Sequence, residues 1–228
     1  MGGDRQNAVR IVAVDTTTPR GSVALVEDGV ARAEVRVVAA DSHSRWLVRA
    51  VEVVVEGQGL APAEVDAWAV ACGPGSFTGL RVGLSTVQGL ALAASRPCVG
   101  ISSLEALAAL ARGSAPAVVA LIDAFRGEVY SGVFDGEGRP VGVPRVGPVE
   151  AVLEGLSGPA AFVGDGAERF RARIEARQPG AVFPVGEPWL AVPLGRIAVA
   201  RIAAGGGIAP EALRPAYIRP ADIRKAAP

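Results

Sequence analysis

The chain has 228 residues, of which 50% are hydrophobic, and its 23 basic and 23 acidic residues give a formal net charge of zero. A neutral chain has no overall basic field, so any contact with nucleic acid has to be local or shared with another protein. Because no apolar run approaches the roughly 18 to 20 residues that span a bilayer, and because the chain begins with polar residues, we expect a cytoplasmic protein without a membrane contact.

The first elements predict a sheet followed by a helix. Apolar segments at 10–15, 21–27 and 31–38 predict three strands, and the Glu27-Asp28-Gly29 turn between the last two indicates an antiparallel meander. A helix is expected over 43–56, capped by Ser42 and ended at Gly57. Its apolar residues are more numerous than one inward face needs, which leaves part of the helix open to a partner.

Strands and helices then alternate. The pattern predicts a strand at 67–72, a helix at 78–94, a strand at 98–101 and a helix at 104–111. A meander followed by alternating strands and helices is typical of a layered α/β lobe of the ribonuclease-H type. We place this first lobe at residues 1–102.

The second half partly repeats the first. Strands are expected at 118–123 and 128–134, joined by a tight turn at 125–127. Helices at 149–156 and 167–177 flank a strand at 160–163, and a late helix at 194–204 is ended by three glycines. We place a second, smaller lobe at 103–228 and leave open that the late helix packs back on the first lobe.

Residues that bind metals or act as nucleophiles are scarce. His43 is the only histidine, which excludes a metal site built on a histidine pair. Cys72 and Cys98 lack Cys-x-x-Cys spacing and are typical of small core residues. Neither Ser76 nor Ser85 has the Gly-x-Ser-x-Gly context of a hydrolase nucleophile. We predict no metal site and no catalytic residue.

The loop between the strand at 67–72 and the helix at 78–94 is dense in glycine. It belongs to the run Gly73-Pro74-Gly75-Ser76-Phe77-Thr78-Gly79-Leu80-Arg81-Val82-Gly83. Ser76 or Thr78 can cap the helix, whose N-terminus attracts anions such as phosphate. The alternative is that Gly79, Gly83 and Gly89 only permit close helix packing. It is not a Walker loop, because no lysine follows the glycines.

This run resembles the GPGSFTGLRVG signature of the bacterial TsaB (YeaZ) family. The resemblance extends over nearly the whole chain through AVDTTT at 13–18, His43-Ser44 and DAFRGEVY at 123–130, with weaker matches at 164–167 and 215–219. Phe125 departs from the family pattern, in which this position is usually basic. The resemblance implies a two-lobed actin-like (ASKHA) fold whose second lobe is reduced.

The resemblance also implies a function. A TsaB-like chain is a non-catalytic scaffold subunit that stabilises TsaD, the enzyme that transfers a threonylcarbamoyl group to the tRNA adenosine beside the anticodon. The ATPase TsaE and tRNA join through the complex, and a similar surface can form a homodimer. The residues expected to contact a partner are His43, Ser44, Trp46, Leu47, Val51, Phe77, Leu80, Arg81 and Leu84.

The alternative is a self-sufficient ATP-dependent phosphotransferase of the actin fold, and a peptidase is the weakest reading because of the lone His43. The strand end at Asp15 lies where actin-like ATPases hold metal-bound phosphate. No cofactor is expected in this chain alone, while ATP or ADP with Mg²⁺ is conceivable at an interface of the complex. The candidate nucleotide-binding residues are Asp15, Thr16, Thr17, Gly73, Gly75, Ser76 and Thr78.

Overall fold

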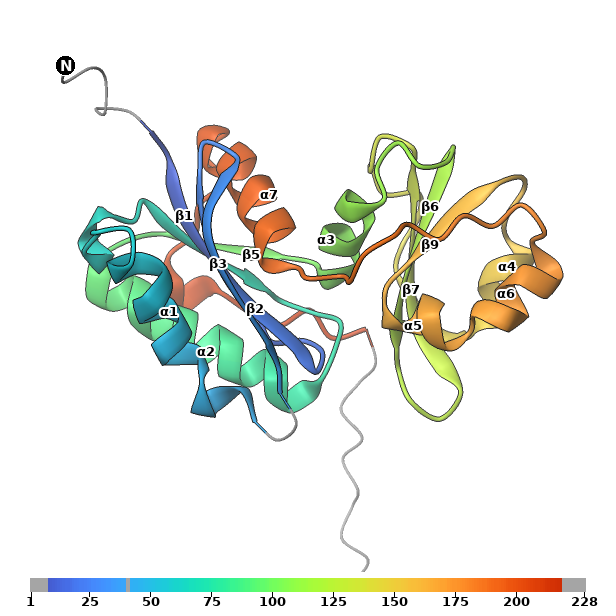
Figure 1. The fold of residues 1–228 in the computed structure, drawn as a ribbon, viewed down its shortest axis with the longest axis horizontal. Helices are drawn as coiled ribbons and strands as arrows, with labels where there is room; N and C mark the ends of the chain where they lie inside the picture. The colour runs from blue at the N-terminus through green and yellow to red at the C-terminus, as the bar shows by residue number, and fades with distance from the viewer. Residues whose placement is uncertain (1–7, 40–41, 219–228) are drawn as a thin grey trace, which may run out of the picture.

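The computed structural model of the chain describes residues 8–39 and 42–218. The start of the first predicted lobe, the end of the second, and Arg219 in the 215–219 match lie outside the described residues. Two sheets stand next to each other, each with helices on both faces (Figure 1). Across the described part of the chain, no helix combines the length and apolar character that a membrane crossing requires.

The first sheet has five strands in the order β3-β2-β1-β4-β5. The first three form the predicted antiparallel meander, and the last two run parallel to the first. β1 and β4 are buried along nearly their whole length, which explains why both are continuous apolar runs. The strands are β1 (Arg10–Asp15), β2 (Arg20–Glu27), β3 (Val30–Val38), β4 (Ala67–Ala71) and β5 (Cys98–Ile101).

Three helices cover the two faces of this sheet (Figure 1). α1 (Leu47–Glu56) and α2 (Phe77–Ala94) share one hydrophobic cluster with one face, and α7 (Ala191–Ala203) packs on the opposite face. The helix predicted over 43–56 begins differently, because His43–Arg45 forms a separate 3-10 turn before α1. The rings of His43 and Trp46 lie against Gly21, which fixes this turn on the sheet.

The second sheet repeats the first with one strand fewer. Its order is β8-β7-β6-β9, with an antiparallel meander and a final strand parallel to β6. This confirms the predicted repeat and the reduced second lobe. The strands are β6 (Ala117–Asp123), β7 (Glu128–Asp135), β8 (Arg145–Pro148) and β9 (Ala160–Val163).

Helices also cover both faces of this second sheet. α3 (Ser103–Leu110) packs on the face nearer the first lobe and also contacts α7, so one core cluster includes residues of both sheets. The opposite face carries α4 (Val149–Glu154), α5 (Asp165–Arg169) and α6 (Arg171–Arg177). The single helix predicted over 167–177 is therefore wrong, because the buried Phe170 interrupts it.

Candidate functional site

Asp15 ends β1 as a fully buried carboxylate. Its Oδ1 atom accepts hydrogen bonds from the backbone N–H of Thr17 at 2.9 Å and from the Thr17 hydroxyl at 2.7 Å. Its Oδ2 atom has no hydrogen-bond partner among the residues that the structure describes. Burial raises the pKa of Asp15 to about 6, although the bonds from Thr17 oppose the increase.

The loop after Asp15 packs directly on the N-terminus of α2. The Thr16 hydroxyl donates to the Gly79 carbonyl at 2.7 Å, and the Ser76 N–H donates to the Thr17 carbonyl at 2.7 Å. Ser76 caps the helix, since its hydroxyl accepts the Gly79 N–H at 3.3 Å. The candidate nucleotide-binding residues are thus brought together, but several of their polar atoms already pair with one another.

The glycines at the start of α2 make this close approach feasible. A Cβ atom at Gly79 would lie 1.9 Å from the Thr16 carbonyl oxygen, and one at Gly83 would lie 2.3 Å from the Thr16 hydroxyl. These contacts support the packing alternative at both positions. Gly89, by contrast, has open space around it, because no atom of the described residues beyond its chain neighbours and its own helix backbone lies within 4 Å of a Cβ there.

The remaining candidates are Gly73 and Thr78 at the two ends of the loop and Gly75 within it, where a Cβ would lie 2.5 Å from the Thr17 carbonyl oxygen. Gly73 has a φ of +110°, and a Cβ on it would lie 3.0 Å from the Ala216 carbonyl oxygen. Thr78 is exposed in the first turn of α2. The loop is therefore lined by the chain's own C-terminal segment on one side and is open on the other.

The buried carboxylate of Asp15 leads to a pH-dependent prediction. The pKa of Asp15 is about 6 in the folded chain and 3.8 in its ordinary state. Its favourable contribution to the free energy of unfolding is therefore fully present below pH 3.8 and is lost as the pH rises through 6. Asp15→Asn should therefore gain up to about 3 kcal/mol in unfolding free energy relative to the original chain between pH 4 and pH 7. Urea denaturation of both proteins across this range tests it. A difference that does not change with pH contradicts the assignment.

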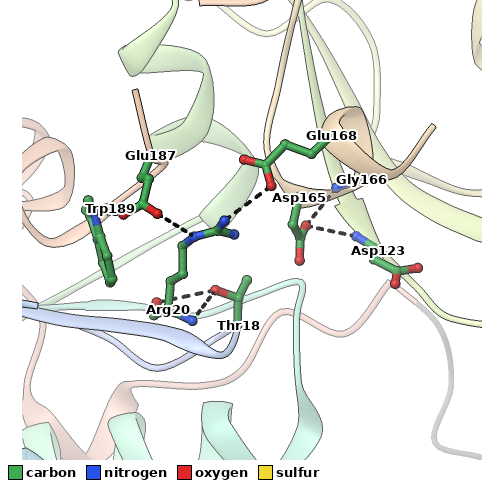
Figure 2. A network of polar contacts seen from close by, with 8 residues as sticks. All are labelled: Thr18, Arg20, Asp123, Asp165, Gly166, Glu168, Glu187 and Trp189. Atoms are coloured by element: carbon green, nitrogen blue, oxygen red, sulfur yellow. Dashed lines mark hydrogen bonds and ion pairs between the residues drawn. The ribbon is translucent and has the colours of Figure 1, made fainter. Parts of the chain in front are cut away.

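An ion-pair network joins the two lobes (Figure 2). The Arg20 guanidinium on β2 lies 3.3 Å from the Glu168 carboxylate on α5 and 4.0 Å from that of Glu187. The Asp165 carboxylate accepts the backbone N–H groups of Asp123 at 3.1 Å and Gly166 at 2.9 Å. Burial raises the pKa of Asp165, because an ionised carboxylate is less well solvated there.

Sequence reasoning found only part of this network. It noted residues 164–167 within the resemblance, but it missed Arg20 and Glu168, which are far apart in the sequence. Such a pair becomes visible only in the folded chain, because neither residue is part of a helix or strand periodicity in the sequence. No group of three or more His, Cys, Asp or Glu residues in the described ranges is arranged to hold a metal ion.

The turn between β6 and β7 is a tight hairpin, as the sequence predicted. The Phe125 N–H donates to the Asp123 carboxylate at 3.0 Å, and the Glu128 N–H donates to the Phe125 carbonyl at 3.0 Å. The Phe125 side chain is 68% exposed. With a single glycine, Gly127, this turn does not have the glycine-rich backbone of a phosphate-binding loop.

The predicted partner-binding residues fall into two groups. Leu47, Val51 and Leu84 lie in the core between α1, α2 and the first sheet, and Leu80 is buried in the first turns of α2. His43 is also buried, where its Nε2 atom lies 2.9 Å from the Thr18 carbonyl oxygen and burial lowers its pKa. Trp46 is half-buried beside His43. The exposed members are Ser44, Phe77 and Arg81.

The outer surface of α1 and α2 carries other apolar residues. Val48 and Val53 on α1 are 51% and 48% exposed, and Leu92 on α2 is 59% exposed. Gly89 lies on the exposed side of α2. We call these four residues the outer helix face. Apolar periodicity marked the buried stripe in the sequence, so it selected the core residues and missed the exposed ones.

Two lobes whose first four strands have the same order, and an acidic residue at the end of the first strand, define a two-lobed actin-like (ASKHA) protein. The activator of 2-hydroxyisocaproyl-CoA dehydratase from Clostridium difficile shares this fold, with a TM-score of 0.53, 9% identity, and coverage of 87% of this chain and 97% of that chain.

Closer similarities identify the family. Residues 35–157 match the family model described as TsaD: tRNA N6-adenosine threonylcarbamoyltransferase. The chain is 36% identical to the tRNA threonylcarbamoyladenosine biosynthesis protein TsaB of Escherichia coli (strain K12), over 69% of this chain and 72% of that protein. It is 40% identical to the Haemophilus influenzae TsaB, over 53% of this chain and 51% of that protein.

Among solved structures, YeaZ from Pseudomonas aeruginosa is 33% identical, with a TM-score of 0.79, and the match covers 92% of this chain and 99% of that chain. The chain belongs to the TsaB (YeaZ) family.

Proposed function

We propose that this chain is a non-catalytic scaffold subunit in the formation of tRNA threonylcarbamoyladenosine, and that it docks on a TsaD-like catalytic subunit through its outer helix face. Family membership supports the pathway. The observation that carries the docking proposal is a set of exposed apolar residues and an exposed glycine on α1 and α2, which the described residues leave uncovered.

Gly89 supports a helix-to-helix contact in particular. A glycine within a helix costs about 0.5–1 kcal/mol relative to alanine, and the described chain does not use the space around this one. Close approach of a partner's backbone accounts for a glycine at this position. Val48, Val53 and Leu92 add apolar area that a partner would remove from water.

The same surface is suited to only one occupant at a time. We propose that a second copy of the chain uses it when the catalytic subunit is absent, and that the complex in turn engages a TsaE-like ATPase and tRNA. In this proposal, threonylcarbamoyladenosine is formed in the cytoplasm, where tRNA is modified. ATP or ADP with Mg²⁺ then binds at an interface of the complex and not in this chain alone.

The competing function is an independent phosphotransferase that uses Asp15. The observation in its favour is that the Oδ2 atom of this buried carboxylate has no hydrogen-bond partner among the described residues. Under that reading, Asp15→Asn abolishes ATP turnover by the isolated chain. Under the scaffold reading, the isolated chain has no turnover to lose, and the variant still binds the catalytic subunit.

Size-exclusion chromatography with light scattering tests the docking proposal. The chain is run alone, with its TsaD counterpart, and with an unrelated protein of similar size. We expect a stable complex only with the TsaD counterpart, and a loss of any homodimer as that complex forms. Separate elution of the two proteins, together with ATP turnover by the chain alone, would support the phosphotransferase instead.

A further inference from the structure

An aromatic stack lies on the surface beside the N-terminus of α2. The Phe77 and Tyr217 rings are stacked with centroids 5.8 Å apart, and the Arg81 guanidinium lies 3.9 Å from the Phe77 ring centroid. Both rings remain nearly half exposed, at 44% for Phe77 and 45% for Tyr217. We call Phe77, Arg81 and Tyr217 the α2 stack.

The chain holds Tyr217 in place from the segment before it. Leu213 is buried, the Gln88 side chain donates to the Leu213 carbonyl at 3.2 Å, and the Ala216 N–H donates to the Cys72 carbonyl at 2.7 Å. The ring itself contributes little to the core because it is exposed. The segment thus presents an aromatic ring on the surface without needing it for the fold.

The α2 stack carries a positive charge on Arg81. Arg81 is the only charged residue between Asp66 and Arg96. Among the described residues, its guanidinium contacts the Phe77 ring and has no carboxylate partner. The sequence that follows Tyr217, outside the described residues, has three basic residues and one acidic residue at 219–228. The N-terminus of α2 adds a partial positive charge.

We propose that the α2 stack binds RNA, with an unpaired base stacked on the exposed aromatic rings and a neighbouring phosphate paired with Arg81. Exposed aromatic rings and arginine are the groups that hold unpaired bases without reading their sequence. A guanidinium that pairs with no carboxylate of the described residues can bind phosphate oxygens. The choice of tRNA as the RNA rests on the proposed function.

A protein partner is the competing occupant. Its apolar side chains would cover the rings and a carboxylate would pair with Arg81. The sequence around Arg81 has no acidic residues, which is compatible with either a phosphate or a carboxylate as its partner. The stacked rings and the basic residues after Tyr217 favour RNA. Removal of the Tyr217 ring should weaken tRNA binding if the occupant is RNA, and binding of the TsaD counterpart if the occupant is a protein.

The test measures two binding reactions with the full chain. Fluorescence anisotropy follows binding of a fluorescein-labelled, unmodified tRNA transcript to the chain, alone and with the TsaD counterpart. Chromatography follows binding of the TsaD counterpart itself. The variants are Tyr217→Ala, with Tyr217→Phe as the matched control, and Arg81→Gln, with Arg81→Lys as the control. Circular dichroism establishes that each variant is folded.

We expect Tyr217→Ala and Arg81→Gln each to weaken tRNA binding about tenfold, while Tyr217→Phe and Arg81→Lys retain most of it and both Tyr217 variants still bind the TsaD counterpart. Unchanged tRNA binding in every variant overturns the inference. So does a loss confined to the TsaD counterpart, which identifies a protein contact. If the original chain does not bind the TsaD counterpart, the proposed function fails, while tRNA binding by the chain alone still decides the inference.

Discussion

Gly79→Ala is expected to destabilise the first lobe by about 3 kcal/mol, which corresponds to a Tm roughly 10 °C lower in a chain of this size. The added Cβ would lie 1.9 Å from the Thr16 carbonyl oxygen, which is backbone and has no rotamer to escape into. Moving the loop away would also break the bond from the Thr16 hydroxyl to the Gly79 carbonyl. Thermal and urea unfolding of the purified variant measure the effect.

Gly89→Ala is the matched control, since it makes the same change in the same helix where the described chain leaves open space. It should leave the chain as stable as before, or more stable by up to about 1 kcal/mol, because alanine favours the helix. If the two substitutions change the stability equally, the effect at position 79 comes from general helix propensity and not from contact with the loop after Asp15.

The double variant Val48→Lys, Val53→Glu is expected to weaken binding of the TsaD counterpart by about a hundredfold. It places two charges on the outer helix face, where desolvating them opposes docking. The fold should tolerate both, because the side chains are exposed. Each new charge also has an opposite charge four residues away on α1, at Glu52 and Arg49. Isothermal titration calorimetry measures the affinity.

The control makes the same two changes, Val143→Lys and Val185→Glu, in the second lobe. These valines are 76% and 105% exposed, and neither lies on the outer helix face. The affinity for the TsaD counterpart should stay within about twofold of the original, because neither position faces the proposed interface. If the two double variants weaken binding equally, the contact does not lie on α1 and α2.

Much of the fold was predictable because the physical signals were local. Buried strands such as β1 and β4 are short apolar runs, and the Glu27-Asp28-Gly29 turn fixes a hairpin. Repetition of the same order after residue 117 predicted the second lobe. The break between α5 and α6 was missed because it occurs at a buried Phe170, with neither glycine nor proline to mark it.

The candidate sites were predictable only in part, because they depend on contacts between distant segments. The glycines at 79 and 83 were visible, but their contacts with Thr16 require the folded chain. Apolar periodicity identified Leu47 and Leu84, which are core residues, since periodicity reports the face that is buried. The pairing of Phe77 with Tyr217 spans most of the sequence and leaves no local pattern.

The most direct test of the scaffold role is an assay of threonylcarbamoyladenosine formation on unmodified tRNA, reconstituted from this chain, its TsaD and TsaE counterparts and the synthase that supplies the activated threonylcarbamoyl group. The scaffold role predicts modification with all components present, loss when this chain is omitted, and none from this chain alone. Full modification without this chain, or ATP-dependent group transfer by this chain alone, would contradict it.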